Sequence, residues 1–115
     1  MMRIIVKKVK RENLEIIQSE LFNFLGYKID NLPSSIDYQS YCNDVLVIDL
    51  LQGLFHLLRR KIESQRTYSN LILSPSQGVI LLYCHQWQTN SRSEQNAFVM
   101  QRVSDAIHQN LINLI

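Results

Sequence analysis

Apolar residues recur at three- and four-residue steps through most of this chain, which is the spacing of one face of an α-helix. The first such stripe predicts a helix over residues 11–26. Its members are Leu14, Ile17, Leu21 and Leu25. Gly26 follows the stripe, and a residue without a Cβ adopts at little cost the left-handed conformation that ends many helices. We therefore expect Gly26 to end the first helix.

A second helical pattern covers residues 41–64, where apolar side chains occupy most of the circumference. Ser40 stands where an N-cap side chain is favoured, and cations gather in the last two turns, where the helix dipole favours positive charge. A helix that is apolar on most sides lies at the centre of a core or against a second subunit. The preceding residues 27–40 contain turn-forming residues and predict a packed loop.

The stretch LSPSQGVILLYCHQW, residues 73–87, predicts a capped helix over residues 75–89. Ser74 fits the N-cap position, where its hydroxyl accepts a backbone N–H. Pro75 fits the first helical position, whose N–H has no helical partner in any case. Gln77 fits the third position, from which its side chain reaches back to the N-cap backbone. The unusual composition of this stretch is therefore explained by helix capping.

Ser91 and Glu94 repeat this chemistry and predict a second capping box at the start of a helix over residues 92–113. Residues 66–73 and 3–9 are rich in β-prone side chains. We expect these two segments to pair as a small ribbon that lies on the helices, because an isolated pair of strands is only marginally stable. The predicted fold is a mainly α, four-helix domain that includes the whole chain.

Composition adds little to this picture. The chain has 115 residues, of which 46% are hydrophobic and 19% charged, as in an ordinary globular domain. The N-terminal apolar run is too short for a secretory signal, and two cysteines make no disulfide framework. We therefore expect a soluble, cytoplasmic protein. Two basic clusters are interpreted as solvated faces, with phosphate binding as the alternative. They contain Arg3, Lys7, Lys8, Lys10 and Arg11, then Arg59, Arg60, Lys61 and Arg66.

Candidate catalytic and metal chemistry is sparse. Cys84 and His85 are neighbours on a helix and point about 100° apart, so they do not easily serve one centre. Cys42 is better placed for a lowered thiol pKa, in the first turn of the predicted second helix, but no base is predicted beside it. The chain has no catalytic motif and no metal-ligand spacing. We therefore predict no enzyme activity, no cofactor and no metal.

A third hypothesis is a small-ligand or catalytic pocket on the second helix. Asp49, Gln52 and His56 lie at steps of three and four residues, so they share one side of that helix. Such a line is more typical of the polar edge of a helix than of a pocket lining. The pocket reading is kept as the third hypothesis.

A helix-turn-helix is the sharper alternative function. The predicted helices 75–89 and 92–113 follow one another across a polar turn. Arg92, Arg102 and Asn96 lie on the second of them, where a recognition helix carries its DNA contacts. The turn is longer than usual for this motif and has no glycine. Nucleic-acid binding is therefore the second hypothesis.

The favoured hypothesis is a small helical interaction or accessory protein without catalytic activity. The second and fourth helices carry apolar residues on more sides than one layer of neighbours covers, and such surfaces usually form interfaces. We expect a homodimer, or another homo-oligomer or protein partner, through helix 4, helix 2 or both, and no membrane partner. The predicted interface on helix 4 consists of Leu111, Ile112, Leu114 and Ile115.

Overall fold

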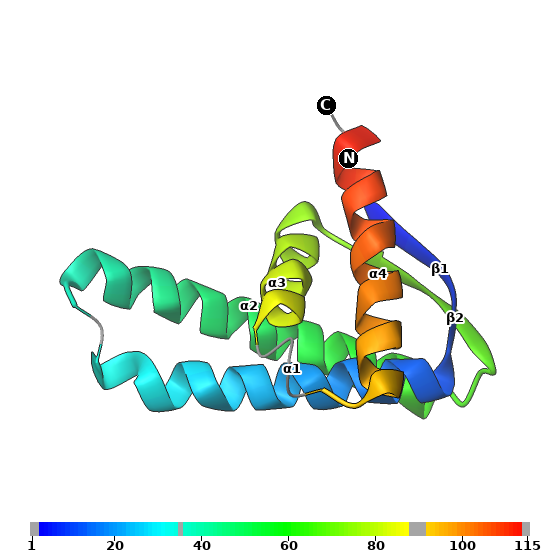
Figure 1. Ribbon diagram of the computed structural model, residues 1–115, viewed down its shortest axis with the longest axis horizontal. Helices are drawn as coiled ribbons and strands as arrows, with labels where there is room; N and C mark the ends of the chain where they lie inside the picture. The colour runs from blue at the N-terminus through cyan, green and yellow to red at the C-terminus, as the bar shows by residue number, and fades with distance from the viewer. Residues whose placement is uncertain (1–2, 35, 88–91, 114–115) are drawn as a thin grey trace.

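The computed structural model describes residues 3–34, 36–87 and 92–113. It confirms a mainly α fold of four helices with a two-stranded antiparallel sheet (Figure 1). The elements in chain order are β1 (Ile4–Lys10), α1 (Arg11–Asn31), the short 3-10 helix η1 (Leu32–Ser34), α2 (Tyr38–Glu63), β2 (Tyr68–Leu73), α3 (Pro75–Gln86) and α4 (Glu94–Asn113).

The two longest helices set the shape of the molecule. α1 and α2 lie antiparallel as a long hairpin, and α3 and α4 stand across the part of it that adjoins the ribbon (Figure 1). The other half of the hairpin projects beyond α3 (Figure 1). The fold therefore has a body built from all elements and an arm built from two helices alone.

Two predicted helix ends are wrong, and both errors lie in this arm. α1 continues through Gly26 to Asn31, and α2 begins at Tyr38 because Asp37 accepts the N–H of Ser40 at 2.7 Å. Ser40 is therefore the residue that is capped, and Asp37 is the cap. Tertiary contacts override the helix penalty of glycine, which is about 1 kcal/mol. The added turn pairs Lys28 with Asp44 at 3.5 Å.

The start of α3 is as predicted. Ser74 Oγ accepts the N–H of Gln77 at 3.2 Å, and Gln77 Oε1 accepts the N–H of Ser74 at 2.9 Å. α3 ends at Gln86, three residues before the predicted end. At the next helix the predicted cap Ser91 lies outside the described residues, whereas Ser93 Oγ accepts the N–H of Asn96 at 3.2 Å. Capping chemistry thus starts both helices.

The predicted ribbon is present, and it contains an irregularity. Ile4 pairs with Leu73, but the register shifts between Val6 and Val9. Inside this bulge Lys8 has a φ of 54°, and its N–H donates to Asn70 Oδ1 at 3.1 Å. A bulge adds one residue to a strand and re-aims side chains. As a result two successive lysines, at positions 7 and 8, are exposed, and Val9 returns to the core.

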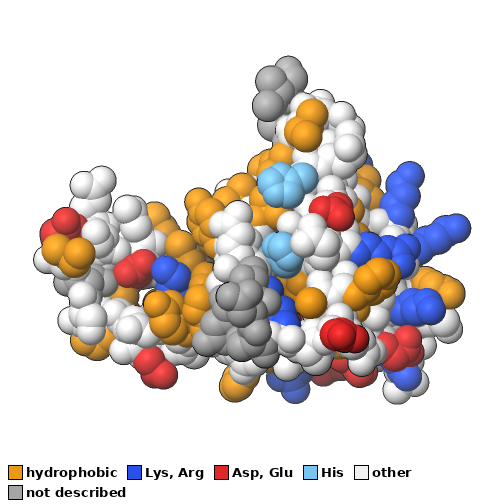
Figure 2. Space-filling model, in the orientation of Figure 1, with side chains coloured by type: hydrophobic (Ala, Val, Ile, Leu, Met, Phe, Trp, Pro, Cys, Tyr) orange, Lys and Arg blue, Asp and Glu red, His pale blue; other side chains and the backbone are white. Residues whose placement is uncertain are grey.

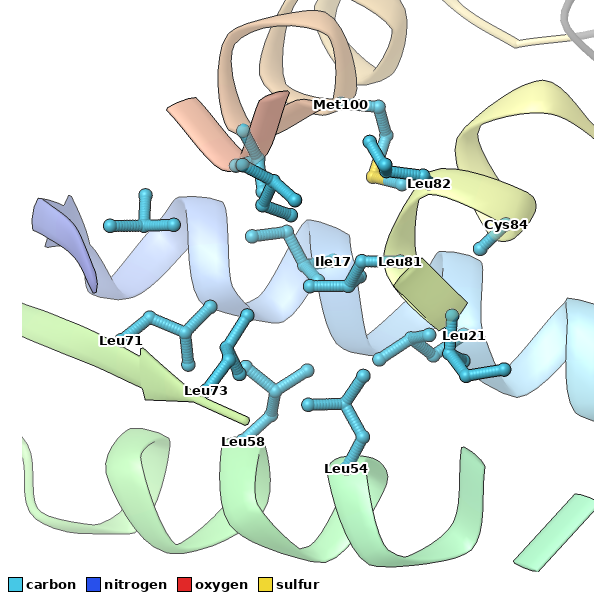
Figure 3. Close-up of a cluster of buried hydrophobic side chains, with 14 of the residues drawn as sticks. Ile17, Leu21, Leu54, Leu58, Leu71, Leu73, Leu81, Leu82, Cys84 and Met100 are labelled. Atoms are coloured by element: carbon cyan, nitrogen blue, oxygen red, sulfur yellow. The ribbon is translucent and has the colours of Figure 1, made fainter. Parts of the chain in front are cut away.

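The core joins side chains from both strands and all four helices (Figure 3). α2 contributes buried residues only from its second half, through Leu51, Leu54 and Leu58. α3 approaches β1 closely at Gly78, where a Cβ would lie 2.5 Å from Ile4 Cδ1. The first half of α2, which belongs to the arm, has no fully buried residue.

Candidate functional site

The structure describes two of the four apolar residues that were predicted as an interface at the C-terminus of the chain. Leu111 is half-buried and packs against the core. Ile112 is 62% exposed. Leu114 and Ile115 lie outside the described residues. The described end of α4 therefore presents one large exposed apolar side chain.

The side chain of Arg92 is buried inside the fold, whereas contact with DNA requires an exposed side chain. Its side chain is 4% exposed and forms an ion pair with Glu20 of α1. The guanidinium also donates to the carbonyls of His85 and Trp87, at 2.6 and 3.0 Å. Arg92 thereby caps the C-terminal end of α3 and joins it to α1. In the sequence, this ion pair is indicated only by Glu20, a carboxylate that stands directly beside the apolar stripe of α1.

Asn96 and Arg102, the other two residues of the helix-turn-helix hypothesis, lie in different surroundings. Asn96 turns toward Glu20, and its Nδ2 donates to Oε2 at 3.4 Å. Arg102 is exposed on α4. Since Arg92 and Asn96 are both engaged by Glu20, the three residues form no shared reading surface.

The two thiols differ in setting. Cys84 is buried, and this burial raises the pKa of its thiol to about 12, against the opposing charge of Arg92. Cys42 is half-buried and lies in the second turn of α2, because that helix begins at Tyr38. The predicted first-turn position of Cys42 is therefore wrong, and the helix N-terminus is one turn away from it.

The polar line on α2 faces solvent. Asp49, Gln52 and His56 are all exposed, and the His56 ring packs edge-on against Phe55 with centroids 5.9 Å apart. This placement fits the polar edge of a helix. Among residues 3–34, 36–87 and 92–113, no three His, Cys, Asp or Glu side chains gather where they would hold a metal ion.

The arm, here residues 22–34 and 36–50, carries most of the large exposed apolar side chains. They are Phe22, Tyr27, Ile29, Ile36, Tyr38, Tyr41, Val45 and Leu46. Ile36 and Tyr38, at the tip, are 96% and 82% exposed. The arm also holds one cation, Lys28, and four carboxylates, so it is an apolar and acidic projection. The carboxylates belong to Asp30, Asp37, Asp44 and Asp49.

α2 is long and apolar enough to cross a membrane by length and composition alone, with a mean hydropathy of 1.2 in an 18-residue window. Its second half is nevertheless built into the core of the body through Leu51, Leu54 and Leu58. Removing α2 into a bilayer would open that core. α2 thus combines a core segment, which contains these three leucines, with an exposed segment in the arm, and 17% of its apolar window is buried.

A groove of about 460 Å³ lies between β1 and the first turns of α4. Four cations line it, and two exposed aromatic rings, Tyr68 and Phe98, stand at its walls. In Figure 2, Lys and Arg side chains gather on this side of the molecule, over the ribbon and the start of α4. The groove is lined by Val6, Lys7, Lys8, Val9, Lys10, Asn13, Tyr68, Gln95, Phe98, Val99, Arg102 and Val103.

A second hollow, of about 550 Å³, lies between the C-terminal end of α2 and β2, at the end of α2 that is farthest from the tip of the arm. Half-buried Leu57 and exposed Ile72 give it an apolar component, and three cations line it. The cations are Arg60, Lys61 and Arg66. The buried hydroxyl of Ser69 also lines the hollow and has no hydrogen-bond partner among the described residues.

No protein-family model, curated protein or solved structure matches this chain. Three surfaces of the described residues are candidates for function: the arm, the groove between β1 and α4, and the hollow between α2 and β2.

Proposed function

We propose that this protein is a small, non-enzymatic interaction protein that self-associates through the arm. The observation that carries the proposal is the exposed apolar surface of the arm. A two-helix arm has one seam in which to bury apolar side chains, and the eight large ones named above remain exposed by 41% or more. Exposed apolar surfaces of this kind usually mark interfaces. A second copy whose α2 lies antiparallel along the full length of this α2 would cover these side chains.

The charge pattern of α2 favours a second copy of this chain as the occupant. Asp37, Asp44 and Asp49 belong to its first half or N-cap, whereas Arg59, Arg60 and Lys61 belong to its last two turns. Two α2 helices packed antiparallel along their full length, with the arm of each copy against the body of the other, place the acidic half of each beside the basic half of the other. This arrangement is self-complementary under a two-fold axis, which is the commonest symmetry of soluble oligomers.

The ends of the proposed interface also match in shape and chemistry. In this full-length antiparallel pairing, the tip of one arm lies beside the C-terminal end of the other copy's α2. The tip offers Ile36, Asp37 and Tyr38, all exposed. The C-terminal end of α2 offers the hollow between α2 and β2, with its apolar side chains and three cations. Near the middle of α2, Gly53 is exposed with no atom within 4 Å of its Cβ position, which allows a second helix backbone to approach closely.

Sedimentation equilibrium at micromolar concentration tests the proposal. We expect a mass near twice the 13.5 kDa of one chain. Leu46→Glu should shift the protein toward monomer, because Leu46 is 63% exposed on the arm. Ile112→Glu is the matched control, since Ile112 is 62% exposed on α4 and lies outside the arm. Both side chains are exposed, so both variants should keep the helical circular dichroism of the parent.

Three outcomes would overturn the proposal. The first is a monomer at all concentrations. The second is a dimer that Ile112→Glu weakens and Leu46→Glu does not, which would move the interface to α4. The third is a monomer that sediments with neutral lipid vesicles and loses this binding in Leu46→Glu, which would make a membrane surface the partner of the arm.

A further inference from the structure

We propose that the groove between β1 and α4 binds single-stranded nucleic acid, with phosphates held by its lysines and Arg102 and bases stacked on its two aromatic rings. This inference is independent of self-association through the arm, because no residue that lines the groove belongs to the arm. It rests on the charge, the aromatic side chains and the backbone of the groove.

The charge of the groove is one-sided. Lys7, Lys8, Lys10 and Arg102 line it, and no carboxylate does. None of these four takes part in an ion pair within the described residues. Elsewhere Lys28, Arg59 and Arg92 each have a carboxylate partner. Unpaired cations along a groove are what a phosphate backbone neutralises, with release of its counterions.

The N-terminal ends of two helices lie near the groove and add to its positive charge. α1 begins at Arg11 and α4 at Glu94, and Asn13 and Gln95 from their first turns line the groove. Both helices therefore present their N-terminal ends, which carry partial positive charge. Glu12 and Glu94 occupy first turns of these helices but do not line the groove. The field inside it consequently favours anions.

The bulge in β1 adds a cation to the groove. In a regular strand, side chains alternate between the two faces, so Lys8 would share the inner face with Val6. The extra residue makes Lys7 and Lys8 both exposed, and both line the groove. The left-handed backbone of Lys8, at a φ of 54°, is unfavourable for a side chain with a Cβ, and the bond from its N–H to Asn70 holds it.

The aromatic rings distinguish a nucleic acid from a simple anion. Phe98 is 66% exposed and Tyr68 is 52% exposed, and both line the same groove as the cations. Single-strand binding proteins combine a basic groove with exposed rings on which unpaired bases stack. The volume, about 460 Å³, lies in the range of small-ligand pockets. The groove thus has room for one or two nucleotide units of a longer strand.

Fluorescence anisotropy with a labelled oligothymidylate, at several salt concentrations, tests the proposal. The slope of log K against log salt should be negative, with about −0.7 for each phosphate that a cation of the groove neutralises and a limit of about −3 for all four cations. Lys8→Ala should make the slope shallower by about 0.7. Phe98→Ala should weaken binding by about 5- to 100-fold while leaving the slope unchanged, because stacking carries no net charge.

The chain offers a matched control for each variant. Arg59→Ala removes a cation that is exposed but paired with Glu63 outside the groove, and it should leave the affinity unchanged. Phe22→Ala removes a ring that is 62% exposed on the arm, and it should also leave the affinity unchanged. Circular dichroism of Phe98→Ala should match that of the parent, because Phe98 is exposed.

Several outcomes would overturn the proposal. Absence of binding at the lowest salt concentration does so directly. An equal loss in Arg59→Ala and Lys8→Ala would show binding by net charge alone. A duplex of the same length that binds as tightly as the single strand would exclude base stacking. Thymidine monophosphate that competes as well as the oligomer, at equal nucleotide concentration, would assign the groove to a free nucleotide.

Discussion

Gly78 is the position where the packing of this fold is most sensitive to a single added methyl group. It is buried at the contact between α3 and β1, and a Cβ there would lie 2.5 Å from Ile4 Cδ1 and 3.3 Å from Ile107 Cγ2. Ordinary carbon–carbon contacts are about 3.5–4.0 Å, so Ile4 Cδ1 would have to move by about 1 Å in a close-packed core. We therefore expect Gly78→Ala to destabilise the protein.

The magnitude follows from two opposing effects. Overpacking of a core costs about 1–3 kcal/mol. Replacing a glycine inside a helix with alanine contributes about 0.5–1 kcal/mol in the other direction. Gly78→Ala should therefore lower the free energy of unfolding by about 1 kcal/mol, and by at most about 2.5 kcal/mol. Gly26→Ala is the matched control, because no atom lies within 4 Å of its Cβ position, and it should stabilise α1 by about 0.5–1 kcal/mol.

A double-mutant cycle with Ile4 separates the steric cause from all others. Ile4→Val removes the atom that the new Cβ would meet and costs about 0.5–1.5 kcal/mol by itself. In the Ile4→Val background, Gly78→Ala should cost about 1 kcal/mol less than it does in the parent. Urea unfolding followed by circular dichroism measures all four proteins. Equal costs of Gly78→Ala in the two backgrounds would refute the reasoning.

Three further expectations concern other contacts. Arg92→Ala should lower the free energy of unfolding by about 3–5 kcal/mol, because it leaves the carboxylate of Glu20 buried without its charged partner. Arg59→Ala removes an exposed ion pair and should lower it by less than about 0.5 kcal/mol. Similar losses in the two variants, measured by urea unfolding, would contradict the structural role of Arg92. Ser74→Ala should cost about 1 kcal/mol through loss of the cap, and no change would reject the capping box. Burial and the charge of Arg92 lower the pKa of His85, so the unfolded chain binds the proton of this imidazole more tightly than the folded chain does. The free energy of unfolding should therefore fall as the pH drops below 6.5, the ordinary pKa of histidine. His85→Gln should reduce this pH dependence.

The elements that sequence predicted well are those fixed by local chemistry. Helix periodicity and the capping box at Ser74 act within a few residues, so their signals stand together in the chain. The ribbon of residues 3–9 and 66–73 was also expected, from β-branched side chains on two separate segments. The structure places its strands within one or two residues of those bounds.

The errors arise where distant contacts override local preference. Gly26 and Ser40 carry end signals that the α1–α2 packing and Asp37 outweigh. Arg92 looked like a surface cation because its partner, Glu20, lies 72 residues earlier in the chain. The groove was missed as a unit for the same reason. Its lysines belong to the N-terminal strand and Arg102 to the last helix, and only the fold brings them together.

The arm and the groove lie at opposite ends of the molecule, and this separates their tests. The arm projects on the side away from the ribbon, whereas the groove lies beside the ribbon (Figure 1). A dimer joined through antiparallel α2 helices would hold both grooves, which no residue of α2 lines, at the two ends of the assembly. A strand long enough to reach both would then bind more tightly than a short one, because its second contact is intramolecular. Leu46→Glu should abolish this length dependence and leave the affinity for a short oligomer unchanged, while Phe98→Ala should weaken binding at every length and leave the dimer intact. If Leu46→Glu weakened the short oligomer as strongly as the long one, the arm and the groove would not be independent surfaces.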